Sequence, residues 1–143
     1  MWRLPGVRSK NHEGRAIPLP QQAWDIIDAQ PKIAGSPFVF VRRGGFSHIK
    51  PLLDRAMQPD APWVTHDLRR TCASGLQKVG TDIVVTEKIL GHKSGTFRGV
   101  VGVYQKHDYL DEARAALQRW ADRIDALVEG KPAEVLRPKF RRR

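Results

Sequence analysis

The stretch YLDEARAALQRWADRIDALVE, residues 109–129, has the clearest pattern in the sequence. Its apolar side chains recur three or four positions apart, which places them along one face of an α-helix. They are Leu110, Ala113, Leu117, Trp120, Ile124 and Leu127. We therefore predict a long helix over residues 109–129, with an apolar stripe that packs in the core or docks on a neighbouring subunit.

Two shorter helices are predicted before it, at about residues 66–79 and 82–90. Gly80 ends the first of these, Thr81 is expected to cap the second, and Gly91 follows the second, because glycine ends helices readily and hydroxyls begin them. In the first helix one side is apolar and is expected to face the core. Its residues are Leu68, Cys72, Leu76 and Val79.

The N-terminal half combines strand and helix patterns. A β-hairpin is predicted over residues 2–19, a helix over 21–30, a short strand over 38–41 and a second helix over 46–57. The sequence therefore predicts a mainly α-helical protein with a small β-sheet at its N-terminal end.

The length and the charge of the chain limit the number of domains and the kind of partner to be expected. A chain of 143 residues is long enough to bury one core without disulfides. We expect one domain over residues 1–129 and a basic, flexible tail over residues 130–143. The formal net charge is +10, and residues 131–143 alone carry six Lys/Arg and one Asp/Glu. Such a surface favours a polyanionic partner, most simply a nucleic acid.

The single cysteine, Cys72, excludes an internal disulfide and is typical of a reducing compartment. We expect it to be a packed thiol. No apolar run is long enough to span a membrane, so a cytoplasmic location is expected. A zinc site formed by Cys72, His66, His92 and His107 is not expected, because no two of them have a short ligand spacing.

The segment THDLRRT, residues 65–71, places a histidine and two arginines at the start of a helix. At about 100° per residue, His66 and Arg69 lie on the same flank of the apolar face, whereas Arg70 points to solvent. A helix N-terminus favours an anion. By themselves, His66 and Arg69 are better explained as a structural pair.

Three further residues give this pair a chemical context: Lys10 at the predicted hairpin turn, His92 after a helix end, and Tyr104. Together these five groups can carry out phosphodiester chemistry without a metal. A guanidinium holds phosphate oxygens bidentately, histidines move protons, and a phenol forms a covalent intermediate. Tyr109 is the alternative nucleophile, but at the start of the long helix it is expected to pack.

The order of these segments resembles the tyrosine recombinase, or phage integrase, family. THDLRRT (65–71) resembles the family's H-x-x-R box, TEKILGHKS (86–94) its LGH box, and VVGVYQKHDYLDEARAALQRWADRI (100–124) its nucleophile segment. WRLPGVRSKN…RAIPLP, within residues 2–20, resembles the hairpin that carries the family's lysine. These segments are similar in amino-acid sequence to those of genomic-island and prophage integrases. The resemblance implies the catalytic-domain fold of DNA breaking-rejoining enzymes.

The resemblance also implies roles. Tyr104 would attack the scissile phosphate to give a 3′-phosphotyrosyl-DNA bond, and Lys10 would be the general acid. Arg69 would stabilise the transition state, His66 would assist as acid or base, and His92 would hydrogen-bond a nonbridging oxygen. No metal or cofactor is needed. Double-stranded DNA would be the partner, in the nucleoid of a bacterial host, and whole recombinases of the family act as tetramers.

Seven basic residues are expected to contact DNA, and one of them is the catalytic Lys10: Arg8, Lys10, Arg42, Arg43, Arg70, Lys93 and Lys106. The family's other arginine belongs to an R-x-x-E box, which this sequence does not contain. Arg3, Arg8 and Arg15 lie on the hairpin and do not replace it by motif. We therefore expect a partial catalytic domain with weak, salt-sensitive DNA binding and little recombination alone.

Two other functions remain open at this stage. One is a non-catalytic DNA-binding remnant of an integrase. The other is a type IB topoisomerase-like enzyme, which uses similar chemistry, although the LGH segment and the small size favour the recombinase. The joint presence of all five predicted catalytic side chains argues for the enzyme over the remnant.

Overall fold

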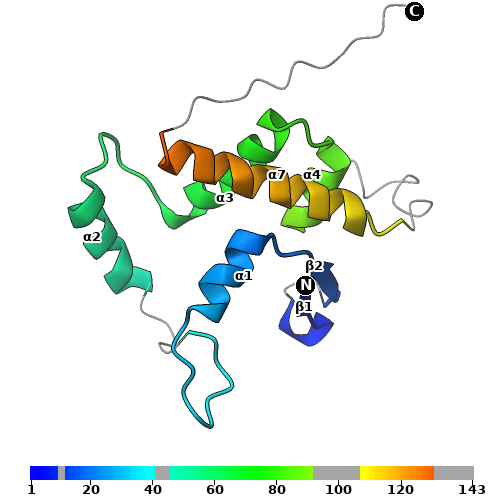
Figure 1. Ribbon diagram of the computed structural model, residues 1–143, viewed down its shortest axis with the longest axis horizontal. Coiled ribbons are helices and arrows are strands. Elements are labelled where there is room, and N and C mark those ends of the chain that lie inside the picture. Colours follow the sequence, from blue (N-terminus) through cyan, green and yellow to red (C-terminus); the bar gives the residue numbers. More distant parts are fainter. Residues whose placement is uncertain (10–11, 41–45, 92–106, 131–143) are drawn as a thin grey trace, which may run out of the picture.

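The computed structural model describes residues 1–9, 12–40, 46–91 and 107–130. Within these ranges the protein is mainly helical, with five α-helices and one two-stranded antiparallel sheet (Figure 1). The predicted fold class is confirmed at this level. None of the described helices is both long enough and apolar enough to cross a membrane.

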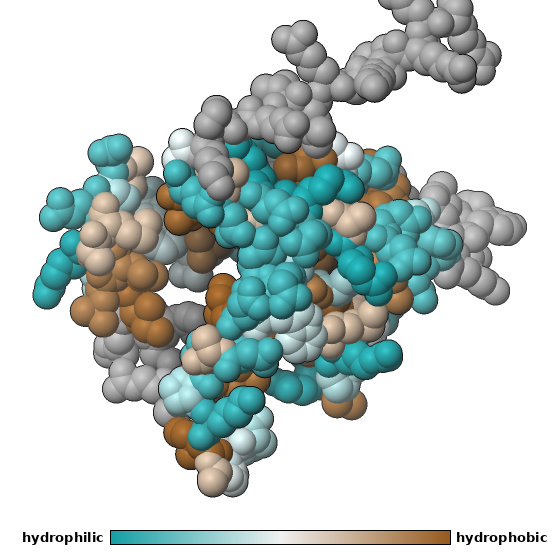
Figure 2. Space-filling view, viewed as in Figure 1, coloured by the Kyte–Doolittle hydropathy of each residue, from teal (hydrophilic) through white to brown (hydrophobic). Residues whose placement is uncertain are grey.

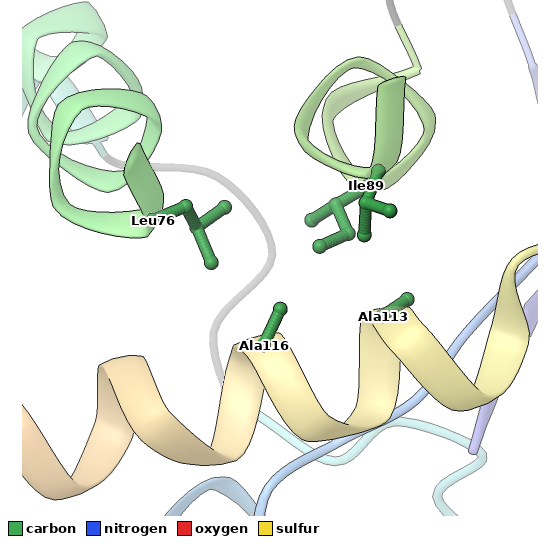
Figure 3. Packing of buried hydrophobic residues seen from close by; sticks show 5 residues of the cluster. Leu76, Ile89, Ala113 and Ala116 are labelled. Atoms are coloured by element: carbon green, nitrogen blue, oxygen red, sulfur yellow. The ribbon is translucent and has the colours of Figure 1, made fainter. Parts of the chain in front are cut away.

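Three helices form the packed centre of the described structure: α3 (Thr65–Lys78), α4 (Ile83–Leu90) and α7 (Leu110–Val128). Each packs against the other two, and α7 also contacts the sheet (Figure 1). The core side chains come from all three helices (Figure 3). They are Leu76, Val85, Ile89, Ala113 and Ala116. Alanines on α7 allow the branched side chains of α3 and α4 to approach its backbone closely.

The predicted stripe of α7 is confirmed over its first part. Ala113 is buried, and Leu117 and Trp120 pack against the core cluster. Further along, Ile124 and Leu127 are 40% and 54% exposed. The apolar stripe therefore extends further along α7 than the described residues that pack against it.

The predicted apolar face of α3 is wrong at its first residue. Leu76 is fully buried and Cys72 packs at the edge of the core, but Leu68 is 61% exposed. The helical period was assigned correctly. Leu68, with most of its surface exposed, lies outside the core that α3 forms with α4 and α7.

The turn between α3 and α4 uses backbone conformations that suit its sequence. Gly80 has φ +76 and Gly91, after α4, has φ +66, both in the left-handed region that glycine adopts without a steric cost. The cap of α4 differs from the prediction. Asp82, not Thr81, is the N-cap, and its carboxylate accepts a hydrogen bond of 2.7 Å from the Val84 amide.

The predicted hairpin is confirmed. Strands β1 (Trp2–Leu4) and β2 (Arg15–Ile17) pair antiparallel, and a short 3-10 helix, Gly6–Arg8, begins the connection between them. In this register Leu4 lies opposite Arg15. Because β2 contacts α7, the hairpin is held beside the helical core.

Helix α1 (Gln21–Asp28) confirms the predicted helix and is tied to α7 by polar side chains. Gln22 donates to Asp122 and Asp125 at 3.0 and 2.8 Å, and Gln118 donates back to Gln22 at 2.9 Å. This network fixes the segment that follows the hairpin.

Helix α2 (Phe46–Met57) is also confirmed, and Figure 1 shows it set apart from α3, α4 and α7. The loop after it folds back, so that the Trp63 indole donates to Asp54 at 2.7 Å and the Lys50 ammonium lies 4.4 Å from the Trp63 ring centroid. Apolar side chains of α2 remain exposed, as Figure 2 shows on that side of the molecule. They are Ile49, Leu52, Leu53 and Met57.

The predicted strand over residues 38–41 is wrong for its described part. Residues 38–40 form no strand, and Phe38, Val39 and Phe40 are 47%, 46% and 57% exposed. A β-rich run becomes a strand only beside a partner strand. The only described sheet, β1 and β2, does not extend to this segment.

Candidate functional site

The start of α3 is organised around Asp67. Its carboxylate accepts a hydrogen bond of 2.9 Å from the Val64 amide and pairs with Arg70 at 2.8 Å. The backbone bond from Val64, and then the Arg70 guanidinium, lower the pKa of Asp67. The Arg70 side chain is 71% exposed, as predicted, and available to solvent. His66, one residue before Asp67, is exposed.

Arg69 points in the other direction, towards the core edge. Its side chain is partly buried, and Nη2 donates a hydrogen bond to the carbonyl of Leu90, the last residue of α4. Burial raises the pKa of the Cys72 thiol, and the nearby positive charge of Arg69 partly offsets this. Cys72 is therefore a packed thiol, as expected, and Arg69 joins α3 to the end of α4.

Arg15, on β2, reaches the same place from the hairpin. A Cβ added to Gly91 would lie 2.8 Å from Arg15 Cζ and closer still to Nη1, so the guanidinium occupies the space above the Gly91 backbone. Arg15 Nε is shielded from water and has no hydrogen-bond partner among the described residues. No sequence pattern distinguishes Arg15 from the other hairpin arginines, because its position depends on a contact with a distant glycine.

Three of the segments quoted from the sequence therefore meet at Leu90 and Gly91. The hairpin contributes Arg15, the THDLRRT helix contributes Arg69, and α4 contributes the carbonyl and the glycine. The end of a helix carries a partial negative charge, which favours the approach of guanidinium groups. In the sequence His92 is the next residue after this point.

Tyr109 has a structural position, as predicted. It is the N-cap of α7, with φ +52, and its partly buried side chain packs against the core cluster. Its ring centroid lies 4.6 Å from that of His107, and its amide donates to His107 Nδ1 at 3.1 Å. The exposed His107 thus supports the turn that leads into α7.

The structure brings together Arg69 and the hairpin, with His66 on the same helix as Arg69. Arg8 is exposed in the hairpin connection. The remaining predicted site residues lie outside the described residues, as does most of the predicted tail, residues 131–143. These are Lys10, Arg42, Arg43, His92, Lys93, Tyr104 and Lys106. Among the described side chains no group of three or more His, Cys, Asp or Glu is arranged to hold a metal ion.

Comparison with known proteins gives one relevant similarity. No family model matches the chain, and no solved structure matches it. The prophage integrase IntA of Escherichia coli (strain K12) is 28% identical to the chain over 140 residues. The match covers 90% of this chain and 32% of that protein, so the chain spans about a third of the length of this relative. In sequence, the chain is thus similar to a prophage integrase.

Proposed function

We propose that this chain carries the C-terminal part of the catalytic domain of a tyrosine-type DNA integrase, over residues 1–129, and that double-stranded DNA is its partner. The observation that carries the proposal is the meeting of the hairpin, the H-x-x-R helix and the end of the LGH helix at Leu90 and Gly91. The similarity to a prophage integrase supports it independently.

The proposed reaction is a transesterification at one phosphodiester. The phenol oxygen of Tyr104 attacks phosphorus, and the bond from phosphorus to the 5′-oxygen breaks. Lys10 donates a proton to the leaving 5′-oxygen, and the phenol's proton passes to a base, for which His66 is the candidate. The products are a 3′-phosphotyrosyl-DNA and a free 5′-hydroxyl, which reverses the step on the same or another strand.

The described residues bear on one part of this mechanism, the stabilisation of negative charge on the phosphate. Arg69 is proposed to hold a nonbridging oxygen while charge builds up on the phosphate, with His92 donating a second hydrogen bond. The bond from Arg69 to Leu90 fixes the direction of its guanidinium before DNA arrives. Such preorganisation is worth about 10² to 10³ in rate for each donor.

The test is covalent capture on a nicked duplex that carries a site selected by binding from a randomised DNA pool. After the attack, the short fragment beyond the nick dissociates, so the protein stays attached to DNA and is visible on a denaturing gel. Because this sequence does not contain the R-x-x-E arginine, we expect only a weak adduct with the native sequence and with Tyr109→Phe, and none with Tyr104→Phe. Tyr109→Phe is the matched control because it removes a hydroxyl from a packed ring.

The outcomes separate the candidate functions. DNA binding without any adduct would favour the non-catalytic DNA-binding protein. An adduct that persists in Tyr104→Phe would show that another residue is the nucleophile. No binding to DNA at all would refute the proposal.

A further inference from the structure

Arg15 and Arg123 each have a guanidinium nitrogen that is shielded from water and has no hydrogen-bond partner among the described residues. Arg70 pairs with Asp67, and Arg114 pairs with Asp111. For Arg15 no carboxylate partner occurs among the described residues, although its Nε is shielded from water. A shielded guanidinium nitrogen without an acceptor costs free energy, so its presence calls for an explanation.

Capping of α4 does not supply that explanation. The carbonyl at the end of α4 that receives a guanidinium is that of Leu90, and its donor is Arg69. Arg15 lies alongside, against the Gly91 backbone. A guanidinium has five N–H donors in a planar fork, which matches the oxygens of a phosphate. Arg15 thus brings unused donors to the place where Arg69 is already fixed.

We propose that Arg15 is a phosphate-binding residue, and that Arg15 and Arg69 together form a two-arginine site for a DNA backbone phosphate at the end of α4. The inference rests on the proposed function, since that function supplies the DNA. It adds a residue to which the resemblance assigns no role, although Arg15 lies on the hairpin that carries Lys10.

The proposal gives Gly91 a second role besides its backbone conformation. Any side chain there would displace the Arg15 guanidinium, since a Cβ would lie 2.8 Å from Cζ. Gly80 has a similar φ, +76, but a Cβ at that position meets nothing within 4 Å. Gly80→Ala therefore measures the cost of the left-handed backbone alone, whereas Gly91→Ala adds displacement of Arg15.

The experiment measures binding of the full chain to a short fluorescent DNA duplex as a function of salt. Each phosphate contact contributes about 0.9 to the slope of log K against log salt. We expect Arg15→Gln to lower the slope by about this amount and to weaken binding about tenfold or more. Arg3→Gln, which removes the same charge from an exposed position on β1, is expected to change the slope much less.

Two further variants keep the test decisive if Arg15→Gln unfolds, which thermal unfolding would reveal. Gly91→Ala is then expected to lower the slope as Arg15→Gln would, while Gly80→Ala leaves it unchanged. Equal slopes for Arg15→Gln and Arg3→Gln, or for the two glycine variants, would overturn the inference and leave the proposed function standing. Absence of DNA binding by the native sequence would overturn both.

Discussion

Asp67 shows how a single residue at the start of α3 orients the arginines around it. Its carboxylate holds the Val64 amide and draws Arg70 towards the helix start and away from the core. Arg69, two positions after Asp67, is left to point towards Leu90. The division of the two arginines between solvent and core edge thus follows from helix geometry and from one acidic neighbour.

The lowered pKa of Asp67 predicts a pH-dependent contribution to stability. A carboxyl whose pKa is lower in the folded state stabilises the fold above its ordinary pKa of about 3.9. That contribution is lost as the pH falls through the folded value. We therefore expect Asp67→Asn to have a lower Tm than the native sequence at neutral pH, with the difference shrinking below about pH 4.

The two largest causes of the lowered Asp67 pKa are the backbone bond from Val64 and the Arg70 guanidinium, and Arg70→Gln separates them. The backbone bond from Val64 is the larger cause and survives in this variant. Thermal unfolding of Arg70→Gln at several pH values should therefore show most of the native pH dependence. A Tm difference between Asp67→Asn and the native sequence that stays constant from neutral to acid pH would contradict this assignment.

Gly75 is the point of closest approach between α3 and the aromatic ring of α7. A Cβ added there would lie 2.5 Å from Trp120 Cζ2. Replacing a helical glycine by alanine ordinarily stabilises a helix by about 1 kcal/mol. Here we expect the opposite sign, because the ring must move: Gly75→Ala should lower the free energy of unfolding by about 1–3 kcal/mol.

Chemical denaturation of a small set of variants tests this contact. Ser74→Ala, at the exposed neighbouring position of α3, is the control and should be neutral or slightly stabilising. In a Trp120→Leu background, Gly75→Ala should cost much less, because the ring is gone. A stabilised Gly75→Ala protein would show that α3 and α7 are not in contact at this point.

At the scale of the elements, α4 depends on its N-cap. Asp82→Ala removes the acceptor for the Val84 amide and should cost about 1 kcal/mol of stability. Thr81→Ala is the matched comparison, because the Thr81 hydroxyl is buried, has no hydrogen-bond partner in the described part of the chain and is not the N-cap of α4. Urea unfolding should rank Asp82→Ala well below Thr81→Ala. The reverse order would place the cap on Thr81 after all.

The elements that could be predicted from the sequence are those whose signals are local. The residues that predict each of these elements, by their periodicity or as end and turn residues, lie within the element's own segment. These elements are the hairpin, α1, α2, α3, α4 and α7. Apart from the N-cap of α4, which is Asp82 and not Thr81, the wrong predictions concern contacts with partners elsewhere in the chain. Leu68 and residues 38–40 have the right side chains for burial or for a sheet, but no described element covers or pairs with them.

The candidate site, too, could be predicted from the sequence only where the signals are local. His66 and Arg69 could be placed on one helix flank from their spacing alone. The meeting of Arg69 with the end of α4, and that of Arg15 with Gly91, required the tertiary structure, because no periodic pattern relates a hairpin strand to a later helix end. Arg15 was accordingly missed, although RAIPLP was recognised as part of the hairpin.

At the scale of the whole molecule, helices α3, α4 and α7 and the hairpin act as one frame. The contacts of α7 with α3, α4 and β2 hold the start of α7 beside the point where Arg15 and Arg69 meet. Tyr104 lies five positions before Tyr109, the N-cap of α7, in the sequence. The central claim is that this frame serves a covalent reaction between Tyr104 and a DNA phosphate.

Peptide mapping of the captured protein tests that claim most directly. After capture on the nicked duplex, nuclease and trypsin digestion leave a nucleotide on the attacking residue, which mass spectrometry locates. Trypsin separates the two candidate tyrosines, with Tyr104 in GVVGVYQK (99–106) and Tyr109 in HDYLDEAR (107–114). We predict the added mass on GVVGVYQK alone. Added mass on HDYLDEAR, or on neither peptide, would contradict the account.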